Sequence, residues 1–147
     1  MNYFIFPDID TTLFQSSGSI NTGLDEILEI QKTMSTSGGN IKVSRILIKF
    51  DLSEISQSMH SGLISTDAKF YLNMYDANSQ NLSTTQSLWA YPVSQSWQEG
   101  QGFLADSPAT SEGASWNFRD GETQKSYWLT GSHAQVSSSG GAWFSDV

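Results

Sequence analysis

The fold class is decided by one ten-residue stretch, Ser44-Arg45-Ile46-Leu47-Ile48-Lys49-Phe50-Asp51-Leu52-Ser53. Its side chains alternate between apolar and polar with a period of two, which is typical of a strand that buries one face. The alternation predicts that the even-numbered apolar residues face the core: Ile46, Ile48, Phe50 and Leu52. Leu47 interrupts the polar face, so we expect the outer side of this strand to be partly covered as well.

A second alternating segment, Asp67–Tyr75, follows after a polar, Ser-rich connection. Two long alternating strands predict an all-β protein, and shorter apolar runs between clusters of Ser and Gly add further strands. No helical periodicity extends beyond a turn or two. The predicted strands are Tyr3–Phe6, Thr11–Gln15, Ile27–Lys32, Val43–Leu52, Lys69–Tyr75, Ser87–Val93, Trp116–Phe118, Ser126–Leu129 and Ala142–Phe144.

Composition limits the classes of function. The 147 residues suit a single domain over residues 1–147. The net charge of -8, from seven basic and fifteen acidic residues, argues against binding to nucleic acid or to an anionic membrane surface. The chain has no cysteine, which excludes disulfides and thiolate metal sites. We find no signal-peptide pattern and no apolar run long enough to span a bilayer, so we expect neither export nor a membrane partner.

The motifs then show a family likeness. The stretch Ser44–Ser53 resembles the hallmark strand of the DNRLRE-type jelly-roll domains, which are related to carbohydrate-binding modules. Upstream, Asp10–Phe14 and Asn21-Thr22-Gly23 resemble the opening strand and the Asn-x-Gly turn of that family. Downstream, Trp97–Gly100 and Ser115–Asn117 resemble its paired Trp-x-Glu-Gly and Thr-Trp-Asn segments. The resemblance implies an antiparallel jelly-roll β-sandwich.

The chain departs from that family at its end. Family members usually continue into one or two closing strands, whereas this sequence stops at Trp143–Val147. Two alternatives stay open: a neighbouring chain completes the sandwich, or the sequence is a fragment of a longer protein. Either way, an unpaired sheet edge invites association with another chain.

A narrower likeness concerns the N-terminal third. The run Phe6–Phe14, together with Asn21–Asp25 and Glu29-Ile30, resembles virion structural proteins of large tailed bacteriophages, notably those that infect marine cyanobacteria. The resemblance implies a non-catalytic subunit of the neck, tail, baseplate, fibre or capsid decoration. Such a protein is assembled in the host cytoplasm and resides in the virion, where its partners are other virion proteins and copies of itself.

Residues that could carry chemistry are scarce. His60 and His133 have no metal-ligating neighbour at a suitable spacing, and we find neither a nucleophile elbow nor a phosphate-binding loop. We therefore predict no catalytic, cofactor-binding or metal-binding residue, and no enzyme. A calcium site built from carboxylates stays open as an alternative, as does a glycosidase pair of Glu99 with Asp120. The candidate carboxylates are Asp8, Asp10, Asp25, Glu99, Asp106 and Asp120.

Aromatic residues are the best candidates for contact with a partner, because large apolar side chains near chain ends are unfavourable in water. The family resemblance implies that Trp97 and Trp116 fill the core of the sandwich or its loop end. We expect Arg45 to anchor a crossing loop through its planar donors. The predicted partner contacts are Tyr3, Phe4, Phe6, Trp128, Trp143 and Phe144. The alternative function is a carbohydrate-binding module that engages host-surface glycans, with Trp128 and Trp143 as exposed sugar-stacking rings.

Overall fold

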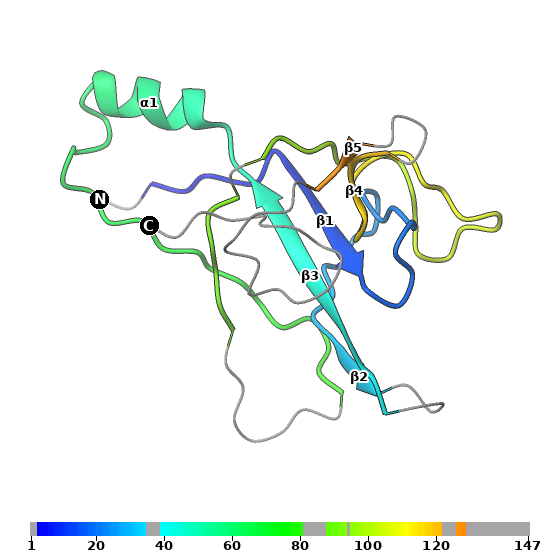
Figure 1. Ribbon diagram of the computed structural model, residues 1–147. Helices are drawn as coiled ribbons and strands as arrows, with labels where there is room; N and C mark the ends of the chain where they lie inside the picture. Colours follow the sequence, from blue (N-terminus) through cyan, green and yellow to red (C-terminus); the bar gives the residue numbers. More distant parts are fainter. Residues whose placement is uncertain (1–2, 35–38, 81–87, 94, 122–125, 129–147) are drawn as a thin grey trace. The chain divides into compact units, whose positions relative to one another are not determined.

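The computed structural model describes residues 3–34, 39–80, 88–93, 95–121 and 126–128 (Figure 1). Predictions that fall on Trp143, on Phe144 or on the strand Ala142–Phe144 lie outside these residues. The chain divides into two compact units, of which unit 1 comprises residues 1–8 and 49–89, and unit 2 comprises residues 9–48 and 90–147. The single domain expected from length stays a prediction.

Unit 2 contains the strands. Strands β1 (Ile9–Phe14), β3 (Ile41–Lys49) and β2 (Lys32–Met34) form a sheet in the order β1-β3-β2 (Figure 1). The β2–β3 pair is antiparallel, and Lys32 lies opposite Val43. A second antiparallel pair joins β4 (Phe118–Asp120) to β5 (Ser126–Tyr127). The expectation of a protein rich in antiparallel strands is therefore confirmed.

The core of unit 2 reverses the predicted orientation of β3. The core cluster contains Leu47, with Val43 packed against it, so the odd-numbered face of β3 points inward. Ile46 and Ile48 are only half-buried and Leu52 is exposed, so the even-numbered assignment was wrong. The complete core cluster is Leu13, Leu47, Ala114, Trp116 and Trp128, with Val43 and Trp97 packed against it.

The charged residue Arg45 lies on the core-facing side of β3 because its guanidinium stacks on an indole. Its guanidinium carbon is 4.5 Å from the centroid of the Trp116 ring, within the range of a cation–π contact. Burial lowers the pKa of the Arg45 guanidinium to about 10, yet the group stays charged at neutral pH. A planar cation stacked on an indole is compatible with an apolar layer, because it needs little water on its flat face.

Several predicted strands are irregular or shorter than expected. Neither Tyr3–Phe6 nor Lys69–Tyr75 is a strand, and only Val93 of the described part of Ser87–Val93 makes a strand bridge. Beside the predicted strand Ile27–Lys32, Ser44 N donates to Gln31 O at 3.0 Å, and the Ser44 side chain adds two further bonds. Its Oγ accepts from Gln31 N at 2.8 Å and donates to Glu29 O at 2.6 Å.

The structure contains a helix that the strand pattern did not predict. Helix α1 (Leu52–His60) belongs to unit 1 and begins where the predicted strand Val43–Leu52 should end. Asp51 is its N-cap, and the Asp51 carboxylate accepts from Ser53 N at 2.8 Å. With Glu54 in the first turn, the sequence matches a capping box. Gly62, at φ +75°, follows the C-cap Ser61 and ends the helix.

The inverted face of β3 predicts a difference between two neighbouring residues. We expect Leu47→Ala to lower the free energy of unfolding by about 2–5 kcal/mol, because the side chain is 3% exposed and leaves a cavity. The matched change Ile48→Ala should cost roughly half as much, since that side chain is half-buried. Urea unfolding followed by tryptophan fluorescence measures both. A larger loss for Ile48→Ala would restore the even-numbered face as the core.

Candidate functional site: an apolar interaction surface

Unit 1 buries very little apolar surface. Among its described residues, Ile64 is the only buried apolar side chain. Twelve large apolar side chains of the same unit are exposed: Tyr3, Phe4, Phe6, Leu52, Leu63, Phe70, Tyr71, Leu72, Met74, Tyr75, Leu88 and Trp89. Because apolar burial is the main favourable contribution to folding and association, a unit of this composition is best stabilised by further burial against another surface.

The largest part of this surface is continuous in sequence. We call residues 69–75 the exposed apolar segment, because every side chain in it is exposed, up to 95% for Tyr75. Among the described residues, no backbone hydrogen bond involves this segment. Its irregular conformation has a simple cause, since a strand forms only when its N–H and C=O groups pair with another strand.

The N-terminal stretch contributes further apolar side chains. Tyr3 is held against α1, since its hydroxyl donates to Glu54 Oε1 at 3.1 Å and accepts from Ser58 Oγ at 3.4 Å. Phe4 and Phe6 have no such anchor in the described hydrogen bonds and are 69% and 79% exposed. The three N-terminal residues among the six predicted partner contacts are therefore accessible, and the contact itself stays a prediction.

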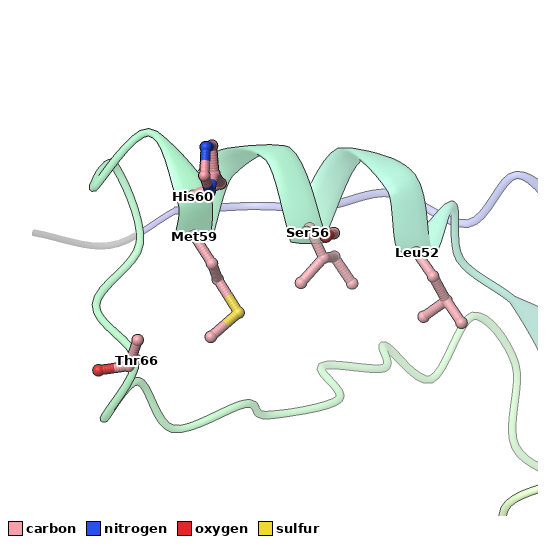
Figure 2. A pocket seen from close by; sticks show the side chains of 6 residues that line it. Leu52, Ser56, Met59, His60 and Thr66 are labelled. Carbon is pink, nitrogen blue, oxygen red and sulfur yellow. The ribbon is translucent and has the colours of Figure 1, made fainter.

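Helix α1 adds an open groove to unit 1 (Figure 2). Leu52, Ile55 and Met59 recur at a spacing of three and four, which places an apolar stripe along one side of the helix. Leu52 and Met59 point toward the stretch that follows Thr66 (Figure 2). The groove is shallow and open to solvent, so its shape suits another protein surface better than an enclosed small ligand. Its complete lining is Leu52, Ile55, Ser56, Met59, His60 and Thr66.

Trp128 does not belong to the exposed surface. Its side chain is 4% exposed in the core cluster, and Nε1 donates to Ser115 O at 2.9 Å. The expectation that Trp128 is exposed was wrong, because the indole fills the layer under β3 and still finds a partner for its polar atom. Trp89, at 78% exposure, is instead the accessible indole among the described tryptophans.

The segments that carry the family likeness meet in unit 2 around Asn21. The Asn21 Nδ2 group donates to Glu99 O at 2.6 Å and to Ala114 O at 2.8 Å. Its Oδ1 accepts from Gly102 N at 2.8 Å and from Gly23 N at 3.2 Å. A Cβ on Gly23 would lie 2.3 Å from Glu99 O, so the two loops touch backbone to backbone. These motifs are therefore used for packing, and they leave no room for a ligand between them.

The candidate carboxylates mostly cap loop backbone. Glu99 Oε1 accepts from Asp10 N at 3.0 Å, both oxygens of Asp25 accept from Leu104 N, and Asp106 accepts from Phe103 N at 2.9 Å. Hydrogen bonds to Phe103 and Thr110 lower the pKa of Asp106. Within the described ranges, no three His, Asp or Glu side chains come together as a metal site would require. The calcium alternative thus has no ligand cluster there to support it.

Side-chain oxygens also close the outer edge of β1. Because Thr12 N donates to Thr22 Oγ1 at 3.2 Å and Asp10 N donates to Glu99 Oε1, neither amide is available to another strand. Thr22 Oγ1 in turn donates to Thr12 O at 2.7 Å. An edge whose amides already donate to side-chain oxygens resists pairing with a further chain.

Comparison of the chain with family models, with curated proteins and with solved structures finds no match. Within the part of the chain that the structure describes, no helix has both the length and the apolar character needed to cross a bilayer. The function is therefore inferred from the surface described above.

The environment of Asp10 predicts a pH-dependent stability. Burial, with a smaller contribution from the Glu99 charge, raises the pKa of Asp10, so its ionisation destabilises unit 2 as the pH rises through that value. We expect Asp10→Asn to raise the Tm of the full chain at pH 7 and to lose this advantage on acidification toward the pKa. Asp67→Asn, at an exposed carboxylate, is the matched control and should change little. A lower Tm for Asp10→Asn at pH 7 would contradict this account.

Proposed function

We propose that this chain is a non-catalytic structural subunit of a bacteriophage virion that acts by burying apolar surface against neighbouring protein chains. The observation that supports assembly through apolar contacts is the contrast, among the described residues of unit 1, between one buried and twelve exposed large apolar side chains. The virion setting rests on the sequence resemblance of residues 6–14, 21–25 and 29–30. The largest apolar patch on a typical monomer covers roughly 300–600 Å², and larger ones mark interaction sites. In a particle, neighbouring subunits bury these exposed apolar side chains.

The arrangement of polar groups also favours an assembly role over catalysis. Glu99, the residue on which an enzymatic reading depends, accepts a hydrogen bond from Asp10 N and lies in a packed loop. Asp25 and Asp106 similarly cap the backbone of the loop that contains Phe103 and Leu104. These carboxylates accept hydrogen bonds from loop amides and so stabilise the loops, which is a structural role.

For the fold, we propose the antiparallel jelly-roll sandwich that the family likeness implies. The strand order β1-β3-β2 and the separate β4–β5 pair are compatible with two facing sheets. The Asn-x-Gly turn and the Trp-x-Glu-Gly segment are hydrogen-bonded through Asn21, so two motifs that carry the family likeness pack together, which supports this fold. In this proposal, the alternating residues 69–75 are a strand of the family pattern that pairs only after association.

Incorporation into particles tests the proposed function. We expect the parent chain in gradient-purified particles of its phage, and we expect Phe4→Ser/Phe6→Ser to reduce its incorporation by about tenfold, since two exposed apolar anchors are lost. Leu24→Ser, at an exposed residue of unit 2, is the control and should be incorporated normally. Quantitative mass spectrometry of the particles measures all three. A parent chain that is abundant in the lysate and missing from particles would refute the role.

The exposure of Trp89 favours a second candidate, a carbohydrate-binding module. Its indole is 78% exposed, and a free aromatic face can stack on a sugar ring. If this function holds, Trp89→Ala should abolish saccharide binding in calorimetric titrations, whereas Leu88→Ala, at an exposed aliphatic neighbour, should retain it. A parent chain without affinity for any glycan on an array would eliminate the candidate.

A further inference from the structure

We infer that the exposed apolar segment, residues 69–75, pairs with the same segment of a second copy to form a symmetric antiparallel ribbon. This inference rests on the assembly role proposed above and names one partner for it. The segment contains neither Pro nor Gly, so every residue has an N–H and a side chain to contribute. Among the described residues its backbone makes no hydrogen bond, and its length is typical of a strand.

The sequence pattern of the segment is symmetric about Leu72. If Leu72 lies on a two-fold axis, Phe70 faces Met74 of the second copy and Leu72 faces its equivalent. Within residues 69–75, one face of the ribbon is then entirely apolar. A register shifted by one residue would set Phe70 against Tyr75 and mix the two faces, which disfavours it. Self-complementarity of this kind is what a two-fold interface requires, because each copy presents the same surface.

The positions of the charged residues also favour the register in which Leu72 lies on the two-fold axis. In it, Lys69 lies opposite Tyr75 of the second copy, where the ammonium and its alkyl stem can pack on the ring. The two flanking carboxylates avoid each other, because each lies opposite an alanine of the second copy. No like charges are therefore placed directly opposite in a chain whose net charge is -8. The flanking pairs are Asp67 with Ala77 and Asp76 with Ala68.

The exposed side chains of the segment supply most of the area that a standard interface buries. Phe70, Tyr71 and Tyr75 are 61%, 77% and 95% exposed, and Leu72 and Met74 about half. With about 150–250 Å² for each aromatic side chain, the segment presents on the order of 600–700 Å² per copy. A standard interface buries about 800 Å² per partner.

Helix α1 supplies the second layer that the ribbon needs. A two-stranded ribbon alone is marginally stable in water, and it needs an apolar surface against one face. The stripe of Leu52, Ile55 and Met59 belongs to the same unit, and two of its side chains point toward the stretch that follows Thr66 (Figure 2). The remaining contact area in the dimer comes from this groove.

The first test is the association state of the full chain by analytical ultracentrifugation. We expect the parent to dimerise, and we expect Leu72→Lys to raise the dimer Kd by at least about tenfold, because it sets two ammonium groups across the axis. Ile30→Lys, at a residue of unit 2 with the same exposed fraction as Leu72, should leave the Kd unchanged. Thermal unfolding should show that neither variant unfolds the core, since both side chains are about half exposed.

The second test determines the register by disulfide cross-linking of introduced cysteines. The chain has no cysteine of its own, so no other thiol can react. With diamide as the oxidant, Leu72→Cys should form a disulfide-linked dimer much faster than Ile30→Cys, at an equally exposed residue of unit 2. A mixture of Phe70→Cys and Met74→Cys chains should cross-link with each other faster than either does with itself, because identical positions then lie about 13 Å apart along the ribbon. Equal rates for all pairs would overturn the register.

The outcomes separate the two proposals. A parent that is monomeric at all concentrations but is incorporated into particles would overturn the self-pairing and leave the assembly role intact. A dimer that survives Leu72→Lys would overturn the ribbon as its interface. A dimer that dissociates with Leu72→Lys, forms in the parent and never enters particles would support the ribbon and refute the virion role.

Discussion

The stacking of Arg45 on Trp116 is the interaction on which the organisation of unit 2 depends. In a strand, a change of one residue moves every side chain to the opposite face. With Arg45 placed against the indole, Leu47 and Val43 must face the core, and Ser44 then faces the stretch around Glu29 and Gln31, which it binds through its hydroxyl. The position of the guanidinium thus determines which residues occupy each of the two faces of β3.

The sequence was informative about the existence of strands and less so about their partners. The alternation in Ser44–Ser53 predicted β3, but it assigned the wrong face because charge was taken as a sign of exposure. A cation that lies flat on an indole breaks that rule, and the partner Trp116 is too distant in sequence for the local pattern to reveal it. Trp128 was misplaced for a similar reason, since its burial depends on Ser115 and the core cluster.

Helix α1 could have been found from the sequence, because Asp51 and Glu54 are spaced as in a capping box and an apolar stripe follows them. The likeness of the whole decapeptide to a family strand concealed this local signal.

For the exposed apolar segment, in contrast, the sequence contains no local signal that decides its conformation. Its residues do alternate as in a strand, but a strand requires a neighbour, and no pattern within seven residues specifies where that neighbour comes from. Of the candidate surface, the sequence therefore predicted Tyr3, Phe4 and Phe6 as contacts, whereas it placed residues 69–75 in a strand.

The closed edge of β1 has a consequence for the size of any assembly. Thr22 and Glu99 occupy the amides of Thr12 and Asp10, so the sheet cannot grow at that border. Pairing of residues 69–75 about a two-fold axis uses that segment in both molecules, so neither the paired segment nor the β1 border offers a site to a further chain. Polymerisation into open-ended fibrils, the usual hazard of apolar β-sequences at high concentration, is thereby discouraged at this border by two side-chain oxygens.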